Sequence, residues 1–359
     1  MNGGQAMNEI TVYTNALTVD NEAIRNAGMV ANHYADQTVF SDYLSRKAQN
    51  TIDSQRTDLK TFCDYLLDVG VTLNADALQN NPNVWTDVTY GLVEGFVKWL
   101  LAKGYATSSI NRKLSTIKVY TKLAYKAGTI DTDTNAKIRI VSGYSGKDAT
   151  NIDNKRDVTR LTNKKEESNF LSPKQYKELV ALQRDNNVGL RNKVVLGLLF
   201  EYGLRVSEVV QLPLANIDID NGRMTVYRHK TGETTNFDLL VTPDFYRLLK
   251  QYMNLCNSTQ YYLMLPATQK TLLDPTYDDN GNVQPLSRIA VQRWLTRQGK
   301  RIGIDKLTPH DARHTALQLL LEQDLNDSVI MDFFGWRTRN MIDQYRQQRA
   351  VANKGISVM

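Results

Sequence analysis

The sequence has few of the residues that hold disulfide-rich domains or metal centres together. Only two of its 359 residues are cysteines, Cys63 and Cys256, and both stand in apolar stretches with helical spacing. Neither belongs to a zinc-binding pattern, so we interpret them as buried thiols in a reducing cytoplasm. From the sequence we expect no disulfide framework, no metal site and no cofactor.

Long apolar segments are also missing. No run of 18 apolar residues occurs, which argues against a membrane-spanning helix. The amino terminus, MNGGQAMNEI, lacks the basic and apolar regions of a secretory signal. We therefore expect a cytoplasmic protein without a membrane partner. A hydrophobic content of 42% is typical of globular proteins, and a length of 359 residues favours two domains.

Charge is distributed unevenly along the chain. The net charge is +6, but residues 1–102 carry six Lys/Arg against twelve Asp/Glu, a net charge of −6. Residues 103–170 carry fourteen Lys/Arg against seven Asp/Glu, a net charge of +7. A basic middle between two folded units is typical of a protein that follows a phosphate backbone, and a solvated linker is the alternative.

Several polar residues in the second half of the chain are suited to binding a phosphate. Arg205 occurs in GLRVSE and Arg313 in PHDARHT. Their planar, permanently charged guanidinium groups match phosphate geometry. The indole of Trp336, in FGWRT, is a donor that can add a hydrogen bond to the same oxygens. Preorganised donors of this kind are commonly the largest contribution to catalysis.

Three further residues complete a set that could cleave a phosphodiester. Tyr345 supplies a phenol, which has a pKa of about 10 and needs a base to act as a nucleophile. His310 titrates near neutrality and suits that task. Lys230, in HKTGE, is a candidate general acid for the leaving 5′-oxygen. Such chemistry needs no metal ion, because the arginines neutralise the phosphate charge, and no ATP, because a phosphotyrosine conserves the energy of the bond.

Taken singly, each of these residues has an ordinary structural explanation. Arg205 could be a surface ion-pair partner, Lys230 a solvated turn residue and His310 a helix cap. Trp336 could be plain core packing, which is common for an isolated tryptophan. The catalytic interpretation therefore depends on the complete set, in its order and spacing. We interpret His314, which follows the HxxR pattern directly, as structural.

The order GLRVSE, HKTG, HxxRH, GW and a tyrosine nine residues after Trp336 resembles the tyrosine site-specific recombinases. This family includes Cre, the lambda-type integrases and the Xer recombinases, and the resemblance covers roughly residues 38–350. It implies that Arg205 and Arg313 are the two catalytic arginines and that Tyr345 is the nucleophile. It places the family's hairpin lysine, its first histidine and an acidic position that braces the site on Lys230, His310 and Glu208. The family's second histidine is replaced by Trp336, as in Cre.

The resemblance also implies a function and a partner. We expect a site-specific recombinase that forms a covalent 3′-phosphotyrosine and works as a homotetramer on two DNA duplexes with inverted-repeat half-sites. Its role would be integration, excision or resolution of a mobile element or replicon. Two alternatives stay open, a type IB topoisomerase-like relaxase and a DNA-binding protein of the same fold that no longer cuts.

The expected fold is mainly α. Residues 1–37 are interpreted as a flexible arm, 38–140 as a helical core-type DNA-binding domain and 141–168 as a linker. Residues 169–359 are interpreted as a mostly helical catalytic domain with a small antiparallel sheet, and the two domains together as a C-shaped clamp on DNA.

Local patterns predict the elements within these domains. Ser172 and Pro173 indicate a capped helix start, Asn221-Gly222 indicates a hairpin, and everything after about 287 is expected to be helical. The remaining predictions are helices at about 51–70, 87–102, 107–126 and 191–203, and strands at 217–219, 224–227 and 237–240.

A second set of residues is predicted to contact DNA outside the catalytic centre. The segment from Arg288 to Lys300 is amphipathic and resembles the helix by which Cre enters the major groove. Arg288 matches an arginine that reads a base there and could pair with guanine O6 and N7; the alternative is that these cations contact phosphates or solvent. The predicted DNA contacts are Arg56, Asn111, Arg112, Lys113, Lys118, Arg288, Arg293 and Lys300.

Overall fold

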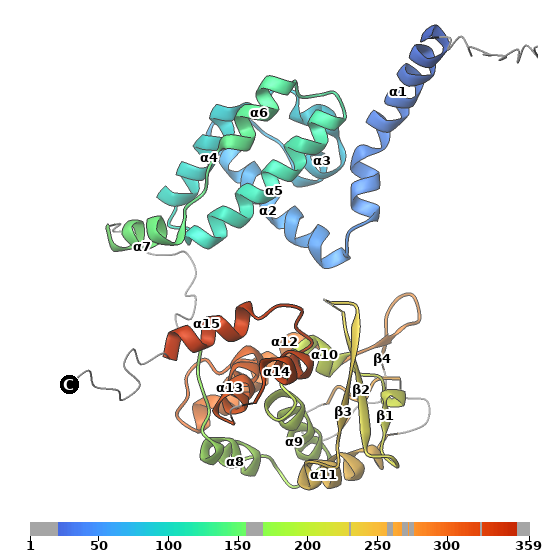
Figure 1. Ribbon diagram of the computed structural model, residues 1–359, viewed down its shortest axis with the longest axis vertical. Helices are drawn as coiled ribbons and strands as arrows, with labels where there is room; N and C mark the ends of the chain where they lie inside the picture. Colours follow the sequence, from blue (N-terminus) through green and yellow to red (C-terminus); the bar gives the residue numbers. More distant parts are fainter. Residues whose placement is uncertain are drawn as a thin grey trace, which may run out of the picture. The chain divides into compact units, whose positions relative to one another are not determined.

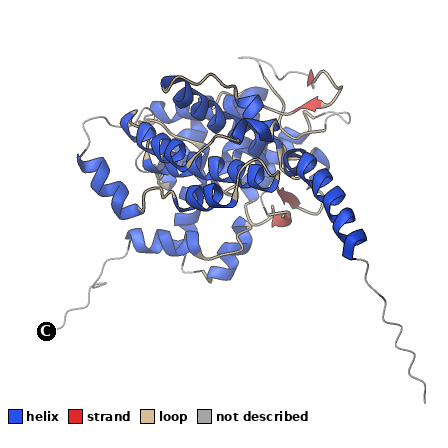
Figure 2. Cartoon of the chain, turned by 90° about the horizontal axis from the view of Figure 1, so that it is seen from above, coloured by secondary structure: helices blue, strands red, loops and turns tan. Residues whose placement is uncertain are grey.

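The computed structural model describes residues 21–155, 168–229, 231–256, 261–267, 272, 276–323 and 325–349 (Figure 1). The chain separates into two compact units, Met1–Lys164 and Lys165–Met359. Helices dominate the described residues and the strands are few and short (Figure 2), as expected from the sequence. No described helix combines the length and apolar character that crossing a bilayer requires.

The first unit is a bundle of helices built around α5. Its elements are α1 (Asn21–Ser45), α2 (Gln49–Asp68), α3 (Ala75–Asn80), η1 (Pro82–Trp85), α4 (Tyr90–Ala102), α5 (Thr107–Lys126), α6 (Thr132–Ile140) and α7 (Gly146–Lys155). Helix α5 packs against α1, α2, α4, α6 and η1, because its apolar residues recur at helical spacing and form a wide buried face. The aromatic rings of Phe62, Trp85 and Tyr120 stack through the centre, at centroid separations of 6.2 and 5.9 Å.

Two segments of this unit are helical where the sequence predicted irregular structure. Helix α1 begins at Asn21, so the predicted start of helical structure at Thr38 was wrong. Its first turns expose Ile24, Met29 and Tyr34, and only the later part reaches the core, through Phe40. Helix α7 lies within the predicted linker, and Ser145 and Asp148 cap its start reciprocally. Neither segment has the buried apolar stripe on which the prediction depended.

The second unit surrounds α9. Its elements are α8 (Pro173–Ala181), α9 (Asn187–Phe200), α10 (Val206–Val210), η2 (Leu214–Asn216), β1 (Ile217–Asp218), β2 (Arg223–Arg228), β3 (Glu233–Asp238), α11 (Pro243–Met253), β4 (Thr276–Tyr277), β5 (Val283–Gln284), α12 (Arg288–Arg301), α13 (Pro309–Glu322), α14 (Asp327–Phe334) and α15 (Asn340–Arg349). Helix α9 packs against α10, α11 and α13, with residues 194–200 all buried. The predicted cap at Ser172 is confirmed, since Ser172 and Gln175 form a capping box ahead of α8 with Pro173 in its first turn.

A three-stranded antiparallel sheet, in the order β1-β2-β3, flanks these helices. The predicted turn at Asn221-Gly222 joins β1 to β2, and Gly222 has a φ of 64°, which favours glycine. Strand β3 begins at Glu233, four residues before the prediction, because its first residues are polar and lack the apolar alternation by which a strand is recognised. Lys230 stands between β2 and β3 in the sequence and lies outside the described residues.

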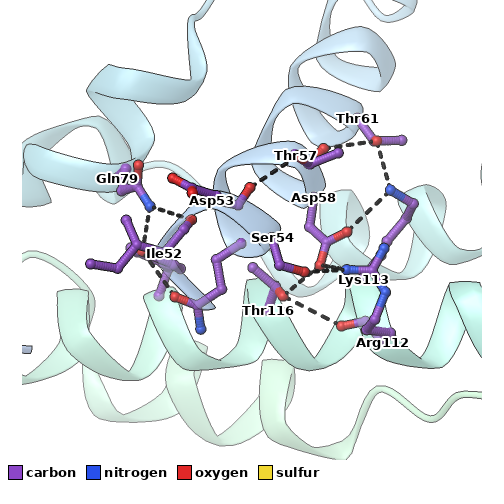
Figure 3. A network of polar contacts seen from close by, with 12 residues as sticks. Ile52, Asp53, Ser54, Thr57, Asp58, Thr61, Gln79, Arg112, Lys113 and Thr116 are labelled. Atoms are coloured by element: carbon purple, nitrogen blue, oxygen red, sulfur yellow. Dashed lines mark hydrogen bonds and ion pairs between the residues drawn. The ribbon is translucent and has the colours of Figure 1, made fainter. Parts of the chain in front are cut away.

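A buried carboxylate joins α2 to α5 in the first unit (Figure 3). Asp58 is 1% exposed and accepts hydrogen bonds from Arg112 Nη1 at 2.6 Å, Lys113 Nζ at 3.2 Å and Thr116 Oγ1 at 2.9 Å. Lys113 also donates to Thr61 Oγ1 at 2.7 Å, and burial lowers the pKa of its ammonium group. Charged groups are retained in such places only when they are paired and hydrogen-bonded, as these are.

We expect Asp58→Ala to lower the free energy of unfolding by about 3–5 kcal/mol, because it leaves the Lys113 ammonium buried without its carboxylate. The control is Asp133→Ala, which removes a solvent-exposed pair with Lys137 and should cost no more than about 0.5 kcal/mol. Urea denaturation of both variants, followed by circular dichroism, measures the difference. Equal losses would show that Asp58 contributes no more than an exposed carboxylate.

Candidate active site

The first predicted arginine follows a sharp turn after α9. Gly203, with a φ of 57°, reverses the chain, and Arg205 occupies the position just before α10. The carboxylate of Glu208 accepts the backbone N–H of Arg205 at 2.8 Å and its Nη1 at 2.7 Å. The Arg205 side chain remains 27% exposed, so Glu208 fixes its direction without covering it.

Glu208 also binds a second arginine, which the sequence analysis missed. Arg228 is fully buried and donates from Nη1 to Glu208 Oε2 at 2.6 Å, from Nη2 to the carbonyl of Phe333 at 2.9 Å and from Nε to Thr235 Oγ1 at 3.3 Å. Burial opposes ionisation of Glu208, but Arg228 and Arg205 outweigh it, and the pKa of Glu208 lies below its usual value. The alternation of side chains along a strand could have indicated that Arg228 is buried, because it places Arg228 on the same face of β2 as Met224 and Val226.

The second predicted arginine, Arg313, lies buried on α13. Its Nη1 donates to the carbonyl of Gly203 at 2.7 Å and its Nη2 to the carbonyl of Phe334 at 2.8 Å. Among the described residues no carboxylate lies within ion-pair distance of it. Burial and the nearby charge of Arg205 lower the pKa of Arg313 to about 9, which leaves it charged at neutral pH. A cation without a carboxylate partner favours an anion as its ligand.

The aromatic residue at the site is held by the end of α14. Gly335 adopts a left-handed conformation with a φ of 60° and ends the helix, and the backbone N–H of Trp336 donates to the carbonyl of Met331 at 2.8 Å. The Trp336 ring stacks on Phe334 at 4.6 Å between centroids, and the guanidinium of Arg313 lies over both rings. Trp336 therefore packs beside Arg313.

The predicted base and nucleophile are connected through His314. Ring centroids are 4.0 Å apart between His310 and His314, which are one turn apart on α13, and 5.0 Å apart between His314 and Tyr345. Tyr345 is 5% exposed and packs in a small apolar cluster with Ile342 of α15 and Phe334 of α14. The three elements α13, α14 and α15 thus bring together residues that the sequence separates by 35 positions.

The predicted DNA contacts fall into two groups. Arg288, Arg293 and Lys300 are exposed on α12, although Lys300 lies 3.8 Å from Asp305. In the first unit most of the predicted contacts have structural partners. Arg56 pairs with Asp76, Asn111 holds the backbone of Tyr144, and Lys118 donates to the carbonyls of Arg139 and Val141.

Within that second group, Lys113 and Arg112 differ. The interpretation of Lys113 as a DNA contact was wrong, because its side chain is only 6% exposed and its ammonium group forms an ion pair with Asp58. Helical periodicity placed it on the outer face, and the buried carboxylate that turns it inward lies 55 positions earlier. Arg112 shares the same carboxylate but is 50% exposed, so its outer face stays accessible.

We expect Arg228→Met to lower the free energy of unfolding by about 3–5 kcal/mol, because Glu208 stays buried while its main ion pair is lost. Arg223→Met changes an exposed arginine of the same strand and should alter stability by no more than about 0.5 kcal/mol. Differential scanning calorimetry distinguishes the two variants. An Arg228→Met protein as stable as Arg223→Met would refute the structural importance of this pair.

Comparisons with known proteins agree with this geometry. The model of the Phage integrase family matches residues 169–351, and that of the phage integrase N-terminal SAM-like domain matches residues 38–128. Tyrosine recombinase XerC of Roseiflexus sp. (strain RS-1) is 24% identical over 303 residues, 80% of each chain. Tyrosine recombinase XerD of Staphylococcus aureus (strain Mu50 / ATCC 700699) is 23% identical over 310 residues, 83% of this chain and 90% of the relative.

Solved structures agree on the fold. A lambda integrase dimer bound to a COC′ core site matches with a TM-score of 0.55 at 15% identity, over 94% of this chain and 84% of that one. A shorter lambda integrase fragment, residues 75–356, in a dimer on the same core site matches with a TM-score of 0.53 at 18% identity, over 89% and 96% of the two chains. With both family models matched in sequence order, the chain belongs to the phage integrase family of tyrosine recombinases.

Proposed function

We propose that this protein recombines DNA at specific sites, and that Tyr345 is the nucleophile that forms a covalent 3′-phosphotyrosine. The observation that carries the proposal is the placement of Arg313. Its charge is buried beside Arg205 without a carboxylate of its own, at the packed junction of α13 and α14 against which the helix of Tyr345 rests. An anion bound there would relieve the repulsion between the two guanidinium groups.

The reaction follows from these positions. Arg205 and Arg313 neutralise the non-bridging oxygens of the scissile phosphate, and the Trp336 indole N–H adds a neutral donor. His310 takes the phenolic proton of Tyr345 as the bond from its oxygen to phosphorus forms. The bond to the 5′-oxygen breaks, and Lys230 protonates that oxygen. A 5′-hydroxyl from another strand reverses these steps and releases Tyr345, so no ATP is consumed.

Double-stranded DNA is the partner that this chemistry requires, and the lambda integrase of similar fold is bound to a DNA core site. We assign residues 38–140 and 169–359 to the two sides of a DNA clamp and residues 141–168 to their connection. The exposed cations of α12, with Arg288 at its first turn, are the proposed readers of the target site. A homotetramer on inverted-repeat half-sites, acting in the cytoplasm on a mobile element or replicon, completes the proposal.

We expect Tyr345→Phe to bind DNA normally but to form no covalent adduct, because the change removes only the hydroxyl group. Incubation with cognate DNA, followed by denaturing gel electrophoresis, detects the adduct. Wild-type protein should still form it in EDTA, since arginines carry the charge that a metal would otherwise supply. A Tyr345→Phe protein that still forms adducts would refute the assignment of the nucleophile.

A substrate with sulfur at the 5′-bridging position separates the role of Lys230 from that of the arginines. We expect Lys230→Ala to cleave ordinary DNA poorly and the sulfur substrate nearly as fast as wild type, because a thiolate leaves without a proton. Arg205→Ala and Arg313→Ala are the matched controls and should stay impaired on both substrates. Cleavage rates from rapid-quench experiments test this, and an equal defect of Lys230→Ala on both would exclude the acid role.

A further inference from the structure

We propose that Asp327 is a positioning residue for the catalytic tyrosine, and that its carboxylate ties α15 to the start of α14. The inference rests on the proposed role of Tyr345. It adds a residue that takes no part in phosphate binding or proton transfer and that no motif of the sequence marks.

The contacts converge on a single carboxylate. Asp327 is the first residue of α14, and its side chain is only 7% exposed. Arg339 donates to its Oδ2 from Nε at 2.9 Å and also from Nη2. Arg346 lies 2.6 Å from Oδ1 through Nη2 and donates to Oδ2 from Nη1 at 3.0 Å. Hydrogen bonds from both arginines hold the pKa of Asp327 below its usual value.

The two arginines flank the nucleophile along the chain. Arg339 immediately precedes α15, and Arg346 immediately follows Tyr345 within it. Both arginine side chains are otherwise well exposed, at 63% and 49%. Exposed ion pairs contribute little, but here one largely buried carboxylate receives two guanidinium groups. Arg346 contacts both of its oxygens, and Arg339 donates to Oδ2 from two nitrogens. Such an arrangement fixes both the entry of α15 and its rotation about its own axis.

The described part of α15 has few other contacts with the core. Among its described side chains only Ile342 and Tyr345 are buried, with Met341 partly so, and they pack on Leu317, Ile330 and Phe334. The neighbouring residues of the helix, from Asp343 to Arg346, are otherwise polar and exposed. The ring of His314 lies 5.0 Å from that of Tyr345 and adds one further contact. With so few apolar contacts along the described part of α15, the ion pairs of Asp327 help to decide where the Tyr345 hydroxyl lies. Misplacement of a reacting group by about 1 Å can cost about 100-fold in rate.

The test compares three variants of the full-length protein. Asp327→Asn keeps the shape but removes the charge, Asp327→Glu restores the charge on a longer side chain, and Asp332→Asn is the control. Asp332 is an exposed carboxylate of the same helix, and no described residue forms an ion pair with it. Cleavage is measured in single turnover on a nicked cognate duplex at saturating protein, and affinity by titration of the same DNA.

We expect Asp327→Asn to lower the cleavage rate about tenfold or more while DNA affinity stays within about twofold of wild type. Asp327→Glu should recover most of the rate, and Asp332→Asn should match wild type. Hydrogen–deuterium exchange should show lost protection in residues 340–349 of Asp327→Asn and unchanged protection in α13. Combining Asp327→Asn with Arg339→Gln should add little further loss, because both changes break the same tether.

Each contrary result has a definite meaning. Wild-type cleavage by Asp327→Asn, or loss of protection throughout α13 as well, would overturn the positioning role. The proposed function fails by a different observation, namely an adduct formed by Tyr345→Phe. The two failures can therefore be told apart within one set of proteins.

Discussion

The buried pair of Glu208 and Arg228 is the interaction on which the catalytic unit depends. It joins three elements that are far apart in the sequence. Glu208 lies in α10 and Arg228 ends β2, and Arg228 also binds the carbonyl of Phe333 near the end of α14. A buried ion pair is seldom a net source of stability, since the desolvation of both charges offsets their attraction. Its contribution here is to fix the positions of α10, β2 and α14 relative to one another. The contacts of the two charged groups join the sheet, the turn before α10 and the end of α14 in one defined arrangement.

This arrangement determines the electrostatics of the site. Among the described residues, Arg205 and Arg228 share the carboxylate of Glu208, and Arg313 is held by carbonyl groups instead. The cluster of described residues therefore carries an excess of positive charge in a partly dry environment, as the lowered pKa of Arg313 reflects. Folding alone does not favour such an excess. An excess of positive charge is expected where an anionic transition state binds and supplies the negative charge that balances it. Without DNA this excess lowers the stability of the protein.

The sequence predicted the family and the mainly helical fold better than it predicted the long-range contacts. Motif spacing indicated Arg205, Arg313, Trp336 and Tyr345, and helical periodicity predicted α5 with its observed ends, because both signals are local. Arg228 and Asp327 were missed, since each is important only through partners 20 and 12–19 positions away that no local pattern reveals. Lys113 was misassigned for the same reason. The start of α1 was missed because its exposed first turns lack the apolar stripe by which a packed helix is recognised.

The two kinds of attachment in the catalytic unit suit two different tasks. Arg313 is fixed by carbonyl groups that follow α9 and end α14, so it can move only if the core moves. Tyr345 instead lies on α15, whose described contacts are a few apolar side chains, the ring of His314 and the ion pairs with Asp327. Phosphate-binding groups gain from rigidity, because preorganised charge needs no rearrangement during the reaction. A nucleophile that must attack, remain bonded to DNA and leave again gains from an attachment that is specific but separable.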